Sequence, residues 1–176
     1  MTELKQPDQQ KTSWMSYIPA SVVGVLTLAQ LISVFFLVID DVNSELKILG
    51  WMIWLLSILF GVLPIIIFRA RGGVPQGKSF VKTTLLVDDG LYGIVRHPQY
   101  LAGILLNLAL ILISQHWLVI LLGLPAMVLM YIDIQKADQN EIEKFGDAYR
   151  DYMERVPQIN FILGIIRQLQ NRRKNR

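Results

Sequence analysis

The sequence predicts an all-α protein: a polytopic transmembrane helical bundle of about four spans, with a cytoplasmic helical segment at its C-terminal end. Three observations predict this fold class. The chain has 176 residues, 53% of them hydrophobic, and a mean hydropathy of +0.42, which is too apolar for an ordinary soluble domain of this length. Three uncharged runs are each long enough to cross a bilayer. Lys and Arg residues gather in particular segments outside those runs.

Residues 17–39 and 48–68 are the first two uncharged runs. Each predicts one spanning helix, because about 20 apolar residues cross a bilayer. A cleaved signal peptide is the alternative for the first run. Its apolar stretch is too long, however, and Asp40 and Asp41 follow it where small residues would mark a cleavage site. We therefore expect both runs to be membrane helices.

Residues 100–132 form a third uncharged run, which is 33 residues long and therefore too long for one ordinary span. Its most polar point is "SQHW" at residues 114–117, which predicts a tight turn between two antiparallel helices. This hairpin should start near Pro98 and end near Ile134. Each helix of about 18 residues would be about 27 Å long at 1.5 Å per residue, just adequate for a thin bilayer.

Lys and Arg residues set the expected orientation of the spans. The segment before the first span carries two of them and the first loop only Lys47. The second loop carries five, the "SQHW" turn none, and the C-terminal tail the remaining nine. The positive-inside rule then puts both termini and the second loop in the cytoplasm, so we expect a multi-pass integral membrane protein.

Two segments outside the spans have patterns of their own. Residues 71–80 predict irregular backbone, and residues 83–95 are β-prone with a turn at Asp89 and Gly90. The fourth helix should continue beyond the membrane until Val156, with Gly146 weakening its middle. One face of this extension combines apolar and acidic residues at spacings of three and four: Ile134, Asp138, Glu141, Phe145, Tyr149 and Tyr152.

The last segment, residues 160–176, places large apolar side chains ahead of a cluster of basic ones. It is too short and too basic to span a bilayer, so we expect an interfacial helix held by anionic lipid headgroups. Nucleic acid is the alternative partner for its Arg-rich end. Beside an amphipathic helix anionic lipid is the simpler partner, and no nucleic acid is expected.

The stretch "GLYGIVRHPQY" brings a cation, an imidazole and a proline to the edge of the hairpin. A single Arg at such an edge is commonly a snorkelling anchor. Here Pro98 suits the first turn of a helix, and the backbone N–H groups before it would face an anion at the positive helix end. Arg96 adds a planar donor fork and His97 a group that exchanges protons. With the rings and hydroxyls of Tyr92 and Tyr100, they predict a site for a small anionic molecule at the cytoplasmic face.

Residue counts exclude several other kinds of site. The chain has no cysteine, which excludes disulfides, a thiol nucleophile and cysteine metal ligands. With only two histidines, His97 and His116, no metal site is expected. The "GKS" at residues 77–79 lacks the upstream glycine of a phosphate-binding loop.

Two stretches together resemble a known family. "LLVDDGLYGIVRHPQYLAG", a helical hairpin and then "FGDAYRDYMERVP" are similar to the isoprenylcysteine carboxyl methyltransferases and their relatives, the phospholipid methyltransferases. The resemblance covers about residues 85–157. It implies an integral membrane enzyme that uses S-adenosylmethionine. The chain then divides into a cytoplasmic tail (1–16), two transmembrane helices (17–68), a methyltransferase-like core (69–159) and the basic tail (160–176).

The resemblance also implies roles for individual residues. Arg96 would bind or orient an anionic acceptor, and Asp138 or Glu141 would hold a cofactor amine or hydroxyl, or the acceptor. The methionine and adenosine parts of the cofactor would contact a further set: Val87, Gly90, Tyr92, His97 and Tyr100.

The sequence departs from the family pattern at its acidic pair. The two positions that hold Glu in the family hold Ala137 and Asp138 here. Glu141 lies one helical turn beyond Asp138 and could compensate by sharing its face. This departure leaves the substrate and the activity itself open.

Several alternatives remain at this point. The acceptor could be a prenylated cysteine carboxylate, a lipid headgroup or another lipophilic molecule. A membrane reductase of the sterol-reductase type, using NADPH, shares a related Arg-His-x-x-Tyr stretch, but the acid expected after its tyrosine is absent beyond Tyr100. A non-catalytic membrane protein on the same scaffold is a third possibility, and the missing Glu at Ala137 favours it. A purely structural helical bundle is the fourth.

Overall fold

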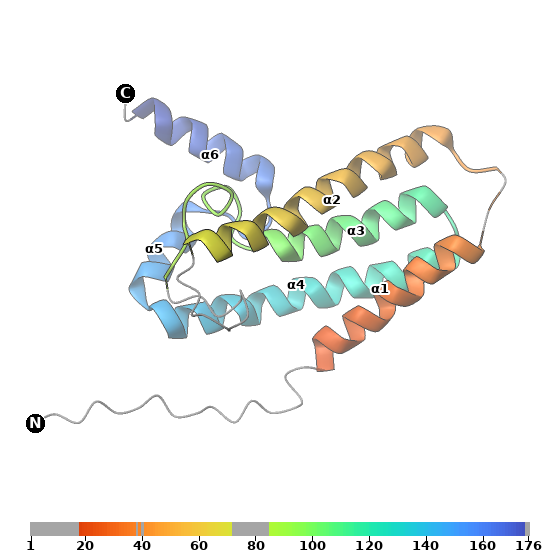
Figure 1. The fold of residues 1–176 in the computed structure, drawn as a ribbon, viewed down its shortest axis with the longest axis horizontal. Helices are drawn as coiled ribbons and strands as arrows, with labels where there is room; N and C mark the ends of the chain where they lie inside the picture. Colours follow the sequence, from red (N-terminus) through yellow and green to blue (C-terminus); the bar gives the residue numbers. More distant parts are fainter. Residues whose placement is uncertain (1–17, 38, 40, 72–84, 175–176) are drawn as a thin grey trace, which may run out of the picture.

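The computed structural model describes residues 18–37, 39, 41–71 and 85–174, and every regular element in these ranges is a helix (Figure 1). The helices are α1 (Ile18–Phe36), α2 (Ser44–Arg71), α3 (Pro98–Ser114), α4 (Trp117–Phe145), α5 (Asp147–Arg155) and α6 (Phe161–Lys174). The predicted all-α class is confirmed. The expectations for residues 1–16, and for irregular backbone in residues 72–80, lie outside the described residues.

The four long helices pack as a bundle in which α3 contacts each of the other three (Figure 1). α2 lies along one side of α3, and α4 lies along another side while also contacting α1. α5 and α6 sit at the end of the bundle where α3 begins (Figure 1). This arrangement gathers the start of α3, the end of α4 and the C-terminal helices in one place.

The predicted hairpin between α3 and α4 is confirmed. Gln115 adopts a left-handed φ of 54°, and its N–H donates to the Ile111 carbonyl at 2.8 Å, which ends α3. His116 then caps α4, because its Nδ1 accepts the Leu118 N–H at 3.1 Å. The Gln115 carboxamide also accepts the Asn43 N–H at 3.0 Å and donates to the Asn43 carbonyl at 2.9 Å. The turn is thereby tied to the segment that precedes α2.

Two of the helices are long and apolar enough to cross a membrane by length and composition. They are Ser44–Ile67 within α2 and the whole of α4, and only 22% of the apolar window of each is buried. The interior helix of a soluble protein would be mostly buried, whereas these helices present large apolar side chains outward. α1 and α3 are shorter apolar helices, so the count of four spans stays a prediction.

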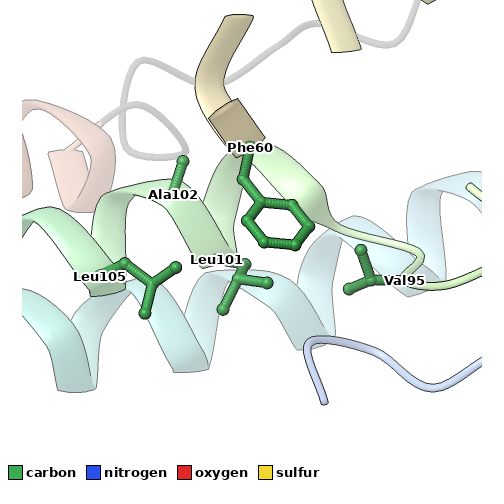
Figure 2. Packing of buried hydrophobic residues seen from close by; sticks show 5 residues of the cluster. All are labelled: Phe60, Val95, Leu101, Ala102 and Leu105. Carbon is green, nitrogen blue, oxygen red and sulfur yellow. The ribbon is translucent and has the colours of Figure 1, made fainter. Parts of the chain in front are cut away.

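An apolar cluster fixes the start of α3 against α2. Figure 2 shows its members around the Phe60 ring: Phe60, Val95, Leu101, Ala102 and Leu105. Val95 is fully buried there. Because Val95 immediately precedes Arg96, the same packing places Arg96 and His97 at the end of the bundle.

Two expectations about local structure are wrong. The described part of the β-prone segment, residues 85–95, contains turns and no strand. Several of its N–H groups close turns instead of pairing with a strand, as Tyr92 N–H does by donating to the Asp89 carbonyl at 3.0 Å. The helix after Ile134 is also not continuous, since Gly146 has a φ of +60° and separates α4 from α5. That value suits glycine and stops an ordinary helix. The expected end of the helix at Val156 is confirmed.

Candidate functional site

The site begins at the first turn of α3. Pro98 is the first residue of this helix, as the sequence predicts, and His97 is its N-cap. The backbone N–H groups of Arg96 and His97 donate to the carbonyls of Pro157 and Gln158, both at 3.0 Å. The expectation that the backbone before Pro98 offers free N–H groups to an anion is therefore wrong for these two groups. The segment after α5 occupies them.

A carboxylate from α4 lies at the centre of the side-chain network. His97 Nε2 lies 2.7 Å from Asp138 Oδ1, and Tyr149 Oη donates to the same oxygen at 2.7 Å. The other oxygen, Oδ2, accepts from Gln158 Nε2 at 2.7 Å and lies 3.3 Å from Arg96 Nη2. Four side chains from three parts of the chain therefore converge on Asp138.

This network is buried, and that governs its electrostatics. Asp138 is 4% exposed and Arg96 and His97 are each 9% exposed. Hydrogen bonds and the nearby guanidinium favour the charged carboxylate, which burial alone would disfavour. Burial raises the pKa of Tyr149, and its hydrogen bond to Asp138 raises it further. Tyr149 is therefore a firmly protonated donor.

The Arg96 guanidinium is only partly satisfied by Asp138. Its Nε and Nη1 atoms are buried and have no hydrogen-bond partner in the part of the chain that the structure describes. Unpaired buried donors cost free energy, about 1–3 kcal/mol each and more when charged. Arg96 also lines a cavity, so an anionic group entering that cavity could relieve the deficit.

The cavity has a volume of about 280 Å³, close to the lower limit typical of small-molecule sites. Its wall is formed by Leu85, Leu86, Val87, Tyr92, Arg96, His97, Pro98, Gln99, Tyr100, Ala137, Asn140, Glu141, Phe145, Tyr149 and Tyr152. Six of the eight predicted site residues are among them. Gly90 and Asp138 are not. Asp138 bonds to the wall residues Arg96, His97 and Tyr149, and Gly90 lies in the turn after Asp89.

The chemistry of the wall suits a cation. Among the described residues, five aromatic rings contribute to it, from Tyr92, Tyr100, Phe145, Tyr149 and Tyr152. Aromatic faces attract cations, and quaternary ammonium groups in particular. Glu141 adds a carboxylate that forms a long ion pair, 3.9 Å, with Lys144 Nζ, and both side chains are 36% exposed. The cavity thus combines a cation-attracting wall with one buried guanidinium.

The loop that covers the cavity is held onto α5. Tyr152 Oη donates to the Tyr92 carbonyl at 2.7 Å, and Arg155 forms a 3.0 Å ion pair with Asp88. Gly90, with a φ of +59°, makes the turn that brings Tyr92 back to this position. Gly90 therefore shapes the loop and is not part of the cavity wall.

Two residues of the network were missed by the sequence reasoning. Tyr149 was recognised within the second motif but was not assigned to the site. It could have been found, because a tyrosine of that motif shares a face with Asp138 at helical spacing. Gln158 carries no comparable signal, since it follows the motif in a segment without periodicity.

Comparison with known proteins identifies one family. Residues 46–147, more than half of the chain, match the family described as phospholipid methyltransferase. The match includes α3, α4 and the cavity residues between Leu85 and Phe145. No curated protein and no solved structure matches the chain.

Proposed function

We propose that this chain, which belongs to the phospholipid methyltransferase family, transfers a methyl group from S-adenosylmethionine to an amine on a lipid headgroup. The family consists of membrane methyltransferases. Membership alone does not specify the methyl donor or the methyl acceptor of this chain. The observation that carries the finer proposal is the His97–Asp138 pair beside an aromatic cavity. S-adenosylmethionine, when bound, supplies an electrophilic methyl group on a positively charged sulfur.

The residues present fit such a donor. The rings of Tyr92, Tyr100 and Phe145 offer faces to a sulfonium. Val87 and His97 also line the wall, as expected for cofactor contacts. Because methyl transfer from a sulfonium disperses charge, the protein's main contribution is to hold the two partners in line and to exclude water.

His97 gives the site a means of removing a proton. Its Nε2 donates to Asp138 when that nitrogen carries the hydrogen, and Nδ1 is then an acceptor. No described residue forms a hydrogen bond with Nδ1, and His97 lines the cavity. An ammonium must lose a proton to expose the lone pair that attacks carbon. In this proposal the N–H proton moves to His97 Nδ1, and Asp138 stabilises the resulting imidazolium.

The same wall favours an amine over the prenylcysteine-type carboxylate. A carboxylate acceptor brings no proton to remove, and it would face the carboxylate of Glu141. An ammonium is attracted by Glu141 and by the rings. The Arg96 Nε and Nη1 atoms, which have no hydrogen-bond partner among the described residues, suit the phosphate that accompanies such an amine in a headgroup.

A non-catalytic role is the second candidate, because of one observation. Ala137 lines the cavity at the position where the resemblance places an acid. A wall without that acid could bind a cationic ligand without turning it over. Glu141 is the one acid among the described residues of the wall, and its contribution decides between the two candidates.

The test uses the purified full chain in lipid vesicles with methyl-labelled S-adenosylmethionine and a membrane lipid extract. We expect label in a lipid amine, and a loss of about 100-fold or more in the variant R96A, as for removal of a charged group that orients substrate. R150A is the matched control, because Arg150 is an exposed arginine on α5. It should label at the parental rate.

Other outcomes separate the alternatives. Label in a base-labile carboxyl ester would support the prenylcysteine-type acceptor and contradict the amine. Binding of S-adenosylhomocysteine by calorimetry without any labelled product would support the non-catalytic role. Binding of NADPH in place of S-adenosylhomocysteine would indicate a reductase.

A further inference from the structure

α6 exposes an apolar surface that the bundle does not cover. Five of its large aliphatic side chains are between 37% and 60% exposed: Ile162, Leu163, Ile165, Ile166 and Leu169. Its contacts with the rest of the chain include Phe161, which packs on Phe60 at 5.6 Å between ring centroids, and Arg167, whose Nη1 donates to the Glu154 carbonyl at 3.3 Å. Beyond them α6 extends away from the bundle (Figure 1). An exposed apolar surface of this kind marks a contact with a membrane or with another protein.

The charge of this segment indicates which partner covers the apolar surface of α6. Residues 161–176 contain five basic residues and no acid. The apolar stretch Phe161–Gln170 would be about 15 Å long, half of what a span requires. Apolar side chains beside a basic cluster, on a helix too short to span, match an anionic bilayer surface. A soluble partner would need its own acidic and apolar patch, for which nothing in the described residues argues.

The segment that leads into α6, residues 156–160, is joined directly to the Asp138 network. Gln158, three residues before Phe161, donates to Asp138 Oδ2 at 2.7 Å. The carbonyls of Pro157 and Gln158 accept the N–H groups of Arg96 and His97. Gly164 lies so close to the Ile94 carbonyl that a β-carbon would collide with it. Through these contacts, a change in the direction of α6 can displace groups that hold Arg96, His97 and Asp138.

We propose that α6 lies on the anionic surface of the membrane and that this contact holds Gln158 against Asp138. The membrane surface thereby becomes part of the support of the site, and Gln158 is a positioning residue. This inference depends on the contacts of residues 156–164 and not on the reaction proposed above.

The first experiment measures where α6 lies. Because the chain has no cysteine, the variant I166C gives a single site for an environment-sensitive fluorophore in the full chain. In nanodiscs that contain phosphatidylglycerol we expect blue-shifted emission, and less of it in nanodiscs of phosphatidylcholine alone. D147C is the control, because the Asp147 side chain is 99% exposed on α5 and should report water in both.

A variant with fewer cations tests whether an anionic membrane surface is the partner of α6. R172Q/R173Q/K174Q removes three cations, which should lower the ratio of docked to undocked α6 on the order of a hundredfold at low salt. Added salt should have the same direction of effect on the parent chain. Emission from I166C that is water-like in both lipids, or equal in both, would overturn the proposal. So would a shift that appears only when a second copy or a soluble protein is added.

The second experiment measures the coupling. Hydrogen exchange of the Arg96 and His97 amides should be slower in phosphatidylglycerol nanodiscs than in phosphatidylcholine ones. Their acceptors, the carbonyls of Pro157 and Gln158, lie in the segment that leads into α6. The charge variant should remove this difference without affecting amides in the middle of α3. G164L, which pushes α6 off Ile94, should speed exchange in both lipids. Exchange that is independent of lipid in the parent chain would contradict the coupling.

Discussion

Two of the buried polar clusters that join the helices of this bundle differ in charge. At the end of the bundle, the charged Arg96–Asp138 pair, with His97 hydrogen-bonded to Asp138, forms an ionised network beside a cavity. In the middle, Gln30 of α1 and Asn107 of α3 are fully buried and neutral. The neutral pair joins helices. In the ionised network, by contrast, the Arg96 Nε and Nη1 atoms find no partner among the described residues, and a ligand could use them.

The neutral group satisfies most of its polar atoms within the bundle. Gln30 Nε2 donates to the carbonyls of Asn107 and Val119 at 3.2 and 3.1 Å. Asn107 Nδ2 donates to the Gly103 carbonyl at 2.9 Å and to Thr27 at 3.3 Å. None of these residues lines the cavity. Removing an ionised partner should therefore cost far more than removing a neutral one.

The largest effect is expected from D138A. The change leaves the Arg96 guanidinium buried without its counter-charge, which costs about 3–5 kcal/mol in comparable buried pairs. The free energy of unfolding can be measured by SDS titration in mixed micelles, with tryptophan fluorescence as the signal.

D138N is the control for this change. It keeps the volume and one acceptor oxygen and removes the charge, so its loss should be intermediate. A D138A loss below about 1 kcal/mol would mean that Arg96 reaches water in the membrane-bound protein, and the contrast with the neutral group would fail.

Y149F should have the second-largest effect. It deletes the hydroxyl that donates to Asp138 Oδ1 and retains the ring that packs on Tyr152. A hydrogen bond to a charged group contributes about 1.5–3 kcal/mol, and His97 partly compensates at the same oxygen. We expect a loss of about 1.5 kcal/mol in the same titration.

Y131F is the matched control, because Tyr131 is 52% exposed on α4. It should lie within about 0.5 kcal/mol of the parent. If the two phenylalanine variants lose equal stability, the Tyr149 hydroxyl does not support the network.

The bond between Tyr149 and Asp138 also shows where sequence reasoning stops. Their spacing predicts a shared helix face, which is correct in that both are buried at the site. In a continuous helix, however, eleven residues would separate them by about 16 Å along the axis. The break at Gly146 turns the chain so that the hydroxyl comes within 2.7 Å of the carboxylate. Local periodicity does not reveal such a turn.

Other parts of the fold were accessible to the sequence for physical reasons. Long uncharged runs, the polar "SQHW" point and Pro98 before an apolar run are local signals, and they correctly predicted α1 to α4 and the hairpin turn. The pairing of Arg96 and His97 with Pro157 and Gln158 joins segments about 60 residues apart. No local pattern encodes it, and for that reason the backbone before α3 was wrongly expected to be free.

N107A should cost less than either change at the ionised network. Hydrogen bonds between membrane helices contribute about 0.6 kcal/mol on average, and a small cavity adds to this, so we expect about 1 kcal/mol. The methyl-transfer rate should not change, because Asn107 does not line the cavity.

The double variant N107A/D138N sharpens the comparison. The two residues share no hydrogen-bond partner among the described residues, so their losses should add within about 0.5 kcal/mol. A larger coupling energy would show that the two polar groups act as one network.

The smallest effect is expected at the opposite end of the bundle, from Q115A and Q115G. Both remove the two hydrogen bonds between the Gln115 carboxamide and Asn43, which are exposed to water and contribute about 0.5 kcal/mol together. Gln115 has a φ of 54°, which costs an L-residue about 1 kcal/mol and glycine almost nothing. Q115A should therefore be slightly less stable than the parent, whereas Q115G should equal or exceed it. If Q115G is the less stable of the two, the turn depends on its side-chain contacts and not on its backbone. The α3–α4 turn would then resemble the ionised end of the bundle, where hydrogen bonds to other segments of the chain determine the local conformation.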